Sequence, residues 1–273
     1  MIELPEAMVL SGQLRNALMG KTVEKVITNA SPHKFAWFYD DPKDYEDKLM
    51  GRKVTDVHAR AGQVEMVFED MHLTFSDGVN LRLYEAKSKL PDKHQLLLRF
   101  NDQSVMACSV QMYGGLMAFA EGENQNPYYL VAGTKPSPLT EAFSADYFNV
   151  LISSVKPTLS LKAFLATEQR IPGLGNGVLQ DILYEAGIHP KRKVGTLSPD
   201  DAEALFLSIK QTLTSMVDLG GRDTEKNLYG EPGGYQTRLS SKSQNEPCYK
   251  CGDIIHKESF MGGSIYYCGT CQK

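Results

Sequence analysis

The sequence contains no membrane-spanning run and no signal peptide. Within its 273 residues no apolar run is long enough to span a bilayer. The N-terminal segment Met1–Glu6 has neither the basic flank nor the apolar core of a signal peptide. Hydrophobic residues make up 42% of the chain and charged residues 23%, which is typical of a globular protein with respectable cores. We therefore expect a cytoplasmic protein, located with the nucleoid if its partner is DNA, and no membrane contact.

An excess of basic residues is also missing. The formal net charge of the chain is −4. Residues 157–273 contain 13 basic and 13 acidic residues, so the acidic excess lies in the first half of the chain. Proteins that bind DNA strongly and without sequence preference usually present a basic surface. The charge balance therefore argues weakly against nucleic acid as a partner.

The five cysteines do not form an even-numbered disulfide framework. Four of them make two Cys-x-x-Cys motifs near the C-terminus, and the fifth, Cys108, stands alone as an expected core residue. Four thiolates at this spacing suit a closed tetrahedral Zn²⁺ site with a structural role. Disulfides and four unpartnered thiols are the alternatives. The predicted ligands are Cys248, Cys251, Cys268 and Cys271.

A glycine-rich turn precedes a helical pattern in Ile171–Lys193. Glycine lets the backbone approach another group closely, and the amides at a helix N-terminus suit an anion such as phosphate. Asn176 could donate to the same anion, and Lys191 adds positive charge beyond the helix. The alternative is an ordinary corner between two helices, in which glycine serves packing alone.

The periodicity of apolar residues changes along the chain. A helical stripe in Leu4–Met19 is followed by mostly alternating, strand-like segments up to about residue 119, and then by helical segments. We predict an α+β protein with an N-terminal helix and β-sandwich, a linker rich in Pro, Gly and Asn, a helical domain and a C-terminal ribbon. The predicted boundaries are 1–123, 124–140, 141–245 and 246–273, and the predicted later helices are 145–155, 160–167, 177–186 and 199–219.

Taken in order, these features resemble one family. The Glu-Leu-Pro-Glu segment Glu3–Glu6, the β-rich first half, the Gly-Leu-Gly-Asn turn Gly173–Asn176 and the cysteine ribbon resemble the formamidopyrimidine-DNA glycosylase/endonuclease VIII family of base excision repair. The resemblance implies a β-sandwich, a helix-two-turn-helix domain and a zinc-finger ribbon. It also implies a monomer that binds double-stranded DNA carrying a damaged base or an abasic site, with DNA N-glycosylase and AP lyase activity on oxidised bases.

The resemblance also assigns chemistry to the N-terminus. In the family a proline that follows the initiator methionine supplies the amine that attacks C1′ of the damaged nucleoside, and carboxylates handle protons. Glu3 and Glu6 match those carboxylates, but Ile2 occupies the proline position. Isoleucine is too large for the usual removal of Met1, so the free amine should belong to Met1. One extra residue displaces that amine by up to about 3.5 Å.

The DNA contacts that the resemblance implies match this chain only in part. Gln63 stands where the family has a strand lysine, and Gly263 where its ribbon has a phosphate-binding arginine. The three residues that the family inserts beside the flipped base correspond to Phe75, Gln111 and Tyr113, although the two aromatic residues could equally belong to the core. Residues of the family's phosphate-contact types remain at His72 and Asn176.

Three functions follow from these matches and mismatches. The first is a glycosylase/lyase that uses the Met1 amine or a nearby lysine, with Glu3 as acid and base. The second is a catalytically silent protein that binds bent, damaged or abasic DNA, as the replacements at Ile2 and Gln63 suggest. The third is a protein–protein scaffold that no longer binds DNA. Without a competent amine, Glu3 could simply cap the first helix.

Overall fold

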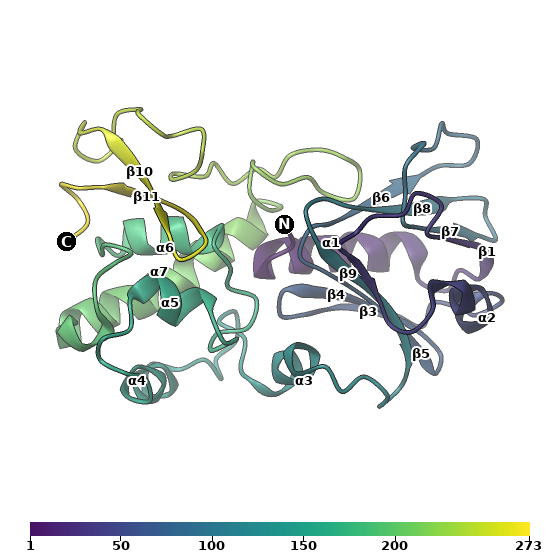
Figure 1. Ribbon diagram of the computed structural model, residues 1–273, viewed down its shortest axis with the longest axis horizontal. Coiled ribbons are helices and arrows are strands. Elements are labelled where there is room, and N and C mark those ends of the chain that lie inside the picture. The colour runs from purple at the N-terminus through teal and green to yellow at the C-terminus, as the bar shows by residue number, and fades with distance from the viewer. The chain divides into compact units, whose positions relative to one another are not determined.

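The computed structural model describes all residues from Met1 to Lys273 and divides into two compact units. The first unit contains 1–133 and 219–234, and the second contains 134–218 and 235–273 (Figure 1). The predicted four-part division differs from this one, because it placed 219–234 in the helical domain and treated the ribbon separately. None of the helices combines the length and the apolar character that a membrane crossing requires.

The first unit contains one long helix and two β-sheets that share a hydrophobic core. Helix α1 contributes Leu10, Leu14 and Leu18 to that core, which confirms the predicted apolar stripe. One sheet has the strand order β1-β7-β8-β6 and the other β2-β9-β5-β4-β3. The elements are α1 (Leu4–Leu18), β1 (Val23–Thr28), β2 (Ala36–Phe38), α2 (Tyr45–Leu49), β3 (Asp56–Arg60), β4 (Gln63–Phe68), β5 (Met71–Ser76), β6 (Val79–Tyr84), β7 (Leu96–Phe100), β8 (Val105–Val110) and β9 (Gly114–Ala120).

The linker predicted for 124–140 contains a helix, α3 (Pro127–Thr134). Its proline lies at the helix start, where the missing N–H costs no hydrogen bond. The side chain of Asn126 accepts a hydrogen bond from the backbone N–H of Tyr128 at 2.9 Å. The Pro and Asn residues that indicated an irregular linker therefore begin a helix.

The second unit is helical and ends in a two-stranded ribbon. Its elements are α4 (Ala145–Ser153), α5 (Leu161–Ala166), α6 (Val178–Glu185), α7 (Pro199–Asp218), β10 (Ile255–Phe260) and β11 (Gly263–Cys268). The four helices lie where the apolar periodicity predicted them, with small differences at their ends. The ribbon packs on α6 through a small buried cluster that includes Tyr184, Ile255 and Tyr266. Leu239 joins this cluster, and Leu228 joins the core of the first unit, so each part of the polar segment 222–245 contributes a buried side chain to its own unit.

Candidate functional site

Residue 2, the family's proline position, is occupied here by a buried strand residue. Ile2 forms an antiparallel bridge with Asp77, and its backbone N–H donates a hydrogen bond to the carbonyl oxygen of Asp77 at 2.5 Å. Its side chain is 7% exposed and belongs to the core of the first unit. The nitrogen of residue 2 is therefore an amide with a partner, and the terminal amine belongs to Met1.

The Met1 amine forms an ion pair with a carboxylate far along the chain. Its nitrogen lies 2.5 Å from Oε2 of Glu225. An amine that is held in such a pair has to separate from the carboxylate before it can attack a sugar carbon. The contact with Glu225 therefore competes with any reaction of this amine.

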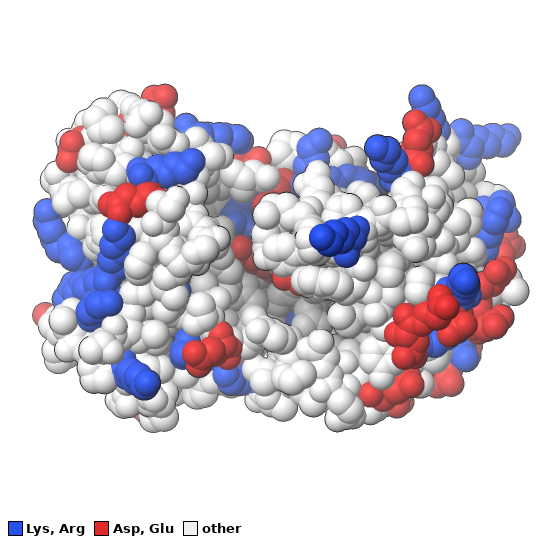
Figure 2. All heavy atoms as spheres, viewed as in Figure 1, with Lys and Arg blue, Asp and Glu red and all other residues white.

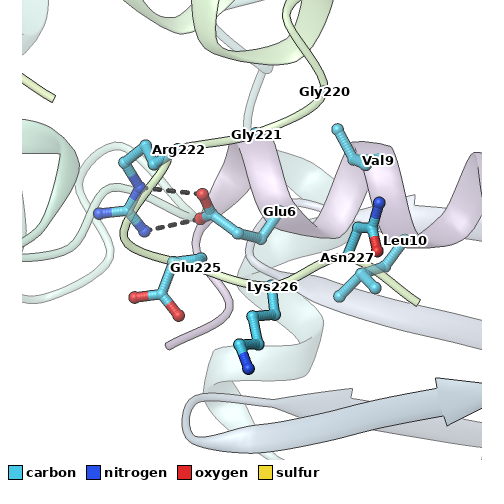
Figure 3. Close-up of a pocket in the computed structure, with 9 residues that line it drawn as sticks. All are labelled: Glu6, Val9, Leu10, Gly220, Gly221, Arg222, Glu225, Lys226 and Asn227. Carbon is cyan, nitrogen blue, oxygen red and sulfur yellow. Dashed lines mark hydrogen bonds and ion pairs between the residues drawn. The ribbon is translucent and has the colours of Figure 1, made fainter. Parts of the chain in front are cut away.

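The two carboxylates of the N-terminal motif share a buried guanidinium. Arg222 donates to both carboxylate oxygens of Glu6, at 2.9 and 2.7 Å, and its Nη1 lies 3.6 Å from a carboxylate oxygen of Glu3. Figure 3 shows the guanidinium pointing at Glu6 beside the start of α1. The exposed fractions of Glu3, Glu6 and Arg222 are 6%, 5% and 3%. Two buried carboxylates thus share one buried guanidinium.

The electrostatics of this cluster favour fixed charges. Burial alone would lower the pKa of Arg222, but the negative charges of Glu6 and Glu3 outweigh burial and raise it above its usual range. A bidentate pair with a permanent cation stabilises the ionised form of a carboxylate. Glu6 also accepts a hydrogen bond from the backbone N–H of Glu3 at 3.2 Å, a capping interaction at the start of α1. Glu6 therefore connects Arg222 to the start of α1.

A cavity of about 280 Å³ adjoins the Met1 amine. All of its lining residues belong to the first unit. Three of them, Met1, Glu6 and Glu225, belong to the ion pairs described above. Gln111 and Met112, from the turn between β8 and β9, also line it. The cavity could admit a group of the size of a nucleobase or a sugar next to the amine.

The three residues that the resemblance assigns to base displacement differ in their exposure to solvent. Phe75 is 0% exposed and packs in the core, so the core alternative holds for it and the wedge assignment does not describe this conformation. Gln111 is exposed, and Tyr113 is half-buried beside it. Trp37 is 46% exposed, and its ring centroid lies 5.6 Å from that of Tyr113.

His72 belongs to a polar cluster that the sequence did not reveal. Its Nδ1 lies 2.8 Å from the buried carboxylate of Glu65, which also contacts His58 Nε2 at 3.1 Å and accepts a hydrogen bond from the Tyr129 hydroxyl at 2.6 Å. Burial would raise the pKa of Glu65, but the hydrogen bonds from His58, Tyr129 and His72, together with the charge of Arg60, lower it to about 2. Glu65 thereby joins three strands to α3.

In the second unit, the glycine-rich turn precedes α6 as expected. Gly173 has φ = 86°, a left-handed conformation that favours glycine. Asn176 is exposed, and its side-chain amide donates to the carbonyl oxygen of Ser264 in the ribbon at 3.0 Å. Lys191 forms an ion pair with Glu258. The structure therefore connects the turn to the ribbon, and a carboxylate partly neutralises one predicted DNA-contacting cation.

The four C-terminal cysteines lie together and could hold a metal ion. Their sulfur atoms all lie within 4.8 Å of one another. The Cys248–Cys271 and Cys251–Cys268 sulfur pairs are 3.8 and 3.5 Å apart. A tetrahedron with metal–sulfur bonds of about 2.3 Å has edges of about 3.8 Å, so these separations fit such a site.

The sequence alone did not identify three residues of these polar clusters, namely Arg222, Glu225 and Glu65. Each omission has a physical reason. Arg222 and Glu225 lie far along the chain from their partners, within a polar, glycine-rich segment that carries no periodic pattern. Glu65 interrupts an apolar strand pattern at a position that is fully buried. That interruption was the one signal in the sequence that could have revealed a buried polar cluster.

The chain therefore has a recognisable architecture, that of a two-unit α+β protein with an N-terminal helix and β-sandwich, a helical unit and a four-cysteine ribbon. A family model for the formamidopyrimidine-DNA glycosylase N-terminal domain matches residues 1–112, and one for the formamidopyrimidine-DNA glycosylase H2TH domain matches residues 135–227. The chain belongs to the formamidopyrimidine-DNA glycosylase/endonuclease VIII family.

Full-length relatives and solved structures agree with this assignment. The formamidopyrimidine-DNA glycosylases of Cytobacillus firmus and Bacillus licheniformis are 27% and 28% identical to this chain, and both alignments cover 100% of each chain. The MutM (Fpg) protein of Thermus thermophilus matches with a TM-score of 0.82 at 24% identity over 99% of this chain and 98% of its own. The Lactococcus lactis Fpg bound to DNA containing N7-benzyl-Fapy-dG matches with a TM-score of 0.84 at 22% identity over 99% of both chains. At this identity the structural matches establish the fold.

Proposed function

We propose that this protein binds double-stranded DNA at damaged or abasic sites and does not carry out the amine chemistry of its family. The observation that carries this proposal is the pair of ionic clusters at the N-terminus. Glu225 holds the Met1 amine, and Arg222 compensates Glu6 and Glu3 in the buried interior. The family scaffold surrounds a site in which each reactive group has a charged partner. We expect the protein to act inside the cell as a monomer.

The groups that would contact DNA retain hydrogen-bonding capacity. His72 uses Nδ1 for Glu65, so Nε2 would donate to a phosphate oxygen only when both ring nitrogens carry a proton. Asn176 donates to Ser264, and its amide has a second N–H available. Lys191 keeps further donors beside Glu258. In the first unit, Gln111 and Tyr113 are further candidates for contacts with DNA.

The surface charge predicts modest affinity that depends on salt. In the view of Figure 2, acidic side chains gather over α2 of the first unit, while Lys and Arg side chains are scattered over both units. Each phosphate that a cation neutralises contributes about 0.9 to the slope of log affinity against log salt concentration. A chain with few such cations should therefore bind DNA measurably only at low or moderate salt.

Binding and chemistry can be tested separately. Fluorescence anisotropy with an abasic-site duplex and a matched undamaged duplex, over a salt series, tests recognition. We expect tighter binding to the abasic duplex, and equal affinity for the two would remove the damage-recognition claim. Absence of binding even at low salt would favour the third function, a protein–protein scaffold.

Borohydride trapping on the same duplex tests the chemistry. We expect no covalent adduct and no strand cleavage from the natural chain. The double variant Ile2→Pro/Gln63→Lys returns two residue types that the resemblance assigns to catalysis. An adduct in that variant alone would indicate that the remaining scaffold is still competent.

A glycosylase/lyase that uses the Met1 amine is the second candidate. The cavity next to that amine, lined also by Glu6 and Lys226, favours it because a reactive sugar would need space at this position. In this case DNA binding would have to separate Met1 from Glu225. A trapped adduct on the natural chain, lost when the N-terminus is acetylated, would establish this activity.

We further propose that the cysteine cluster holds a structural Zn²⁺. Four sulfur ligands leave no open coordination position for a substrate, so the ion would stabilise the ribbon and take no part in a reaction. The ribbon contributes only a small apolar cluster of its own, so metal binding would supply much of its folding free energy. One zinc ion per chain, measured by native mass spectrometry, is the expected result.

A further inference from the structure

An exposed aromatic cluster lies at one edge of the five-stranded sheet. Trp37 and Phe35 are each 46% exposed, and Met112 is 70% exposed. The rings of Trp37 and Tyr113 have centroids 5.6 Å apart and planes inclined by 35°. Isolated exposed apolar residues are common and need no explanation, but an exposed cluster indicates an interaction site.

The backbone around this cluster is held by hydrogen bonds. β2 pairs in parallel with β9, with Trp37 opposite Gly115, and the Gly114 N–H donates to the Phe35 carbonyl at 3.0 Å. The turn that carries Tyr113 is fastened to Gly78 by two backbone hydrogen bonds, of 2.9 and 2.8 Å. A Cβ at residue 78 would lie 2.0 Å from the carbonyl oxygen of Gln111, so only glycine permits this approach. The two rings are therefore presented by a fixed backbone.

The same turn connects the rings to the cavity beside the N-terminus. Gln111 and Met112 line that cavity, and Tyr113 follows directly. In the segment that precedes β2, the ammonium group of Lys34 lies 5.3 Å from the ring centroid of Phe35. Aromatic faces, an exposed amide and a cation thus occur together within two short segments. A nucleotide has the matching parts: a π-face, a hydrogen-bonding edge and a phosphate.

We infer that Trp37 and Tyr113 form a stacking platform for an unpaired nucleobase of the bound DNA. The inference rests on the proposed DNA binding and adds to it a residue, Trp37, that no other feature of the site assigns. The base would stack against the exposed indole face, while Gln111 contacts its edge. Because every base has a π-face, the platform would favour disrupted over fully paired DNA without requiring a particular sequence.

The chain offers a direct probe of this platform, because Trp37 is its only tryptophan. Tryptophan emission should be quenched when the abasic-site duplex, which leaves one base unpaired, is titrated into the natural protein. Trp37→Ala should weaken binding to that duplex by about tenfold, since stacking on one aromatic side chain is typically worth this much. Trp37→Phe, which keeps a ring, should recover most of the affinity. Tyr128→Ala removes another exposed aromatic side chain of the first unit and should leave the affinity unchanged.

The outcomes separate this inference from the proposed function. If anisotropy reports binding but the emission does not change and Trp37→Ala binds as well as the natural chain, the platform is refuted and DNA binding stands. If no DNA binds at low salt, both fail. If Trp37→Ala instead changes the sedimentation of the free protein with no effect on DNA affinity, the cluster is a protein–protein contact and the inference is overturned.

Discussion

The N-terminal carboxylate site and the C-terminal cysteine ribbon are assembled in opposite ways. The four sulfur atoms of the ribbon come from two Cys-x-x-Cys motifs within the short segment Cys248–Cys271, and they lie within 4.8 Å of one another. The N-terminal site instead joins Met1, Glu3 and Glu6 to Arg222 and Glu225, which follow only after the whole β-sandwich and most of the helical unit.

This contrast shows which parts of a family pattern can be transferred by resemblance. The ribbon motif carries its whole ligand set with it, so the matching motif predicts the matching site. The N-terminal motif carries only half of its site, and the other half depends on what the distant segment supplies. Glu3 and Glu6 match the family by type, but the motif does not reveal Arg222, which contacts both of them. Changes made in each region can therefore test the contrast.

If the cysteine cluster holds Zn²⁺ as proposed, loss of the ion should perturb the protein most, and the damage should be confined to the second unit. In Cys271→Ser the metal site is incomplete, and zinc-finger peptides derive roughly 10–16 kcal/mol of apparent binding free energy from zinc. We expect the variant to lose its metal in native mass spectrometry and to lose hydrogen-exchange protection in 246–273. Cys108→Ser, which alters the buried lone thiol of the first unit, should keep the metal. Equal metal content in the two variants would contradict the assignment.

Removing the buried guanidinium should be the next most damaging change. Arg222→Ala leaves Glu3 and Glu6 buried without a counter-charge, and breaking a buried pair in this way costs about 3–5 kcal/mol. We expect a corresponding decrease in the free energy of unfolding, measured with urea. Arg52→Ala is the matched control, since Arg52 pairs with the exposed Asp70 and such surface pairs contribute at most about 1 kcal/mol. If the two variants lost similar amounts of unfolding free energy, the buried N-terminal cluster would stabilise the protein no more than a surface ion pair does.

The Glu65 cluster extends the comparison to pH. Since the pKa of Glu65 is lowered to about 2, its carboxylate contributes stability that is complete above its ordinary pKa and lost as the pH falls toward 2. A shift of this size corresponds to a few kcal/mol, on the order of 3. Urea midpoints of the natural chain should therefore fall between about pH 5 and pH 3, and those of Glu65→Gln should fall less.

The control for this experiment is Asp102→Asn. Burial alone would raise the pKa of Asp102, but hydrogen bonds from Lys21 and Ser104 and the charge of Lys21 together outweigh it and lower the pKa to about 2. Because Asp102 is 45% exposed, solvent screens its contribution. Asp102→Asn should therefore change the pH dependence of the urea midpoint much less than Glu65→Gln does. A larger change in Asp102→Asn would show that burial does not determine how much each carboxylate contributes to stability.

Restoring one cation should change the protein least. If the protein binds DNA as proposed, Gln63→Lys adds one phosphate contact and should steepen the salt dependence of log affinity by about 0.9. The affinity at moderate salt should rise only a few-fold. Gln103→Lys adds the same charge in the exposed turn between β7 and β8 and should change the salt slope less. Equal slopes for the two variants would assign the effect to net charge and remove the specific role of residue 63.

Much of the fold could be predicted because its signals are local. The stripe of Leu10, Leu14 and Leu18 predicted α1, and alternating apolar residues predicted most of the strands. The linker was an exception. Asn and Pro are typical of irregular segments, but here Asn126 and Pro127 lie at the start of a helix. The exposure of Trp37 has no sequence signal either, because composition alone favours burial of a large aromatic side chain, whereas the β2–β9 pairing leaves it at the surface.

The cysteine spacing, the glycine-rich turn and the replacement of the family's proline by Ile2 can all be read from the chain before it folds, because they are properties of neighbouring residues. The partners of the N-terminal charges cannot. Folding alone brings Glu225 to the Met1 amine and Arg222 to Glu6 and Glu3. Charge pairing depends on distance in space and on burial, and a segment remote in the chain can supply both without leaving any local pattern.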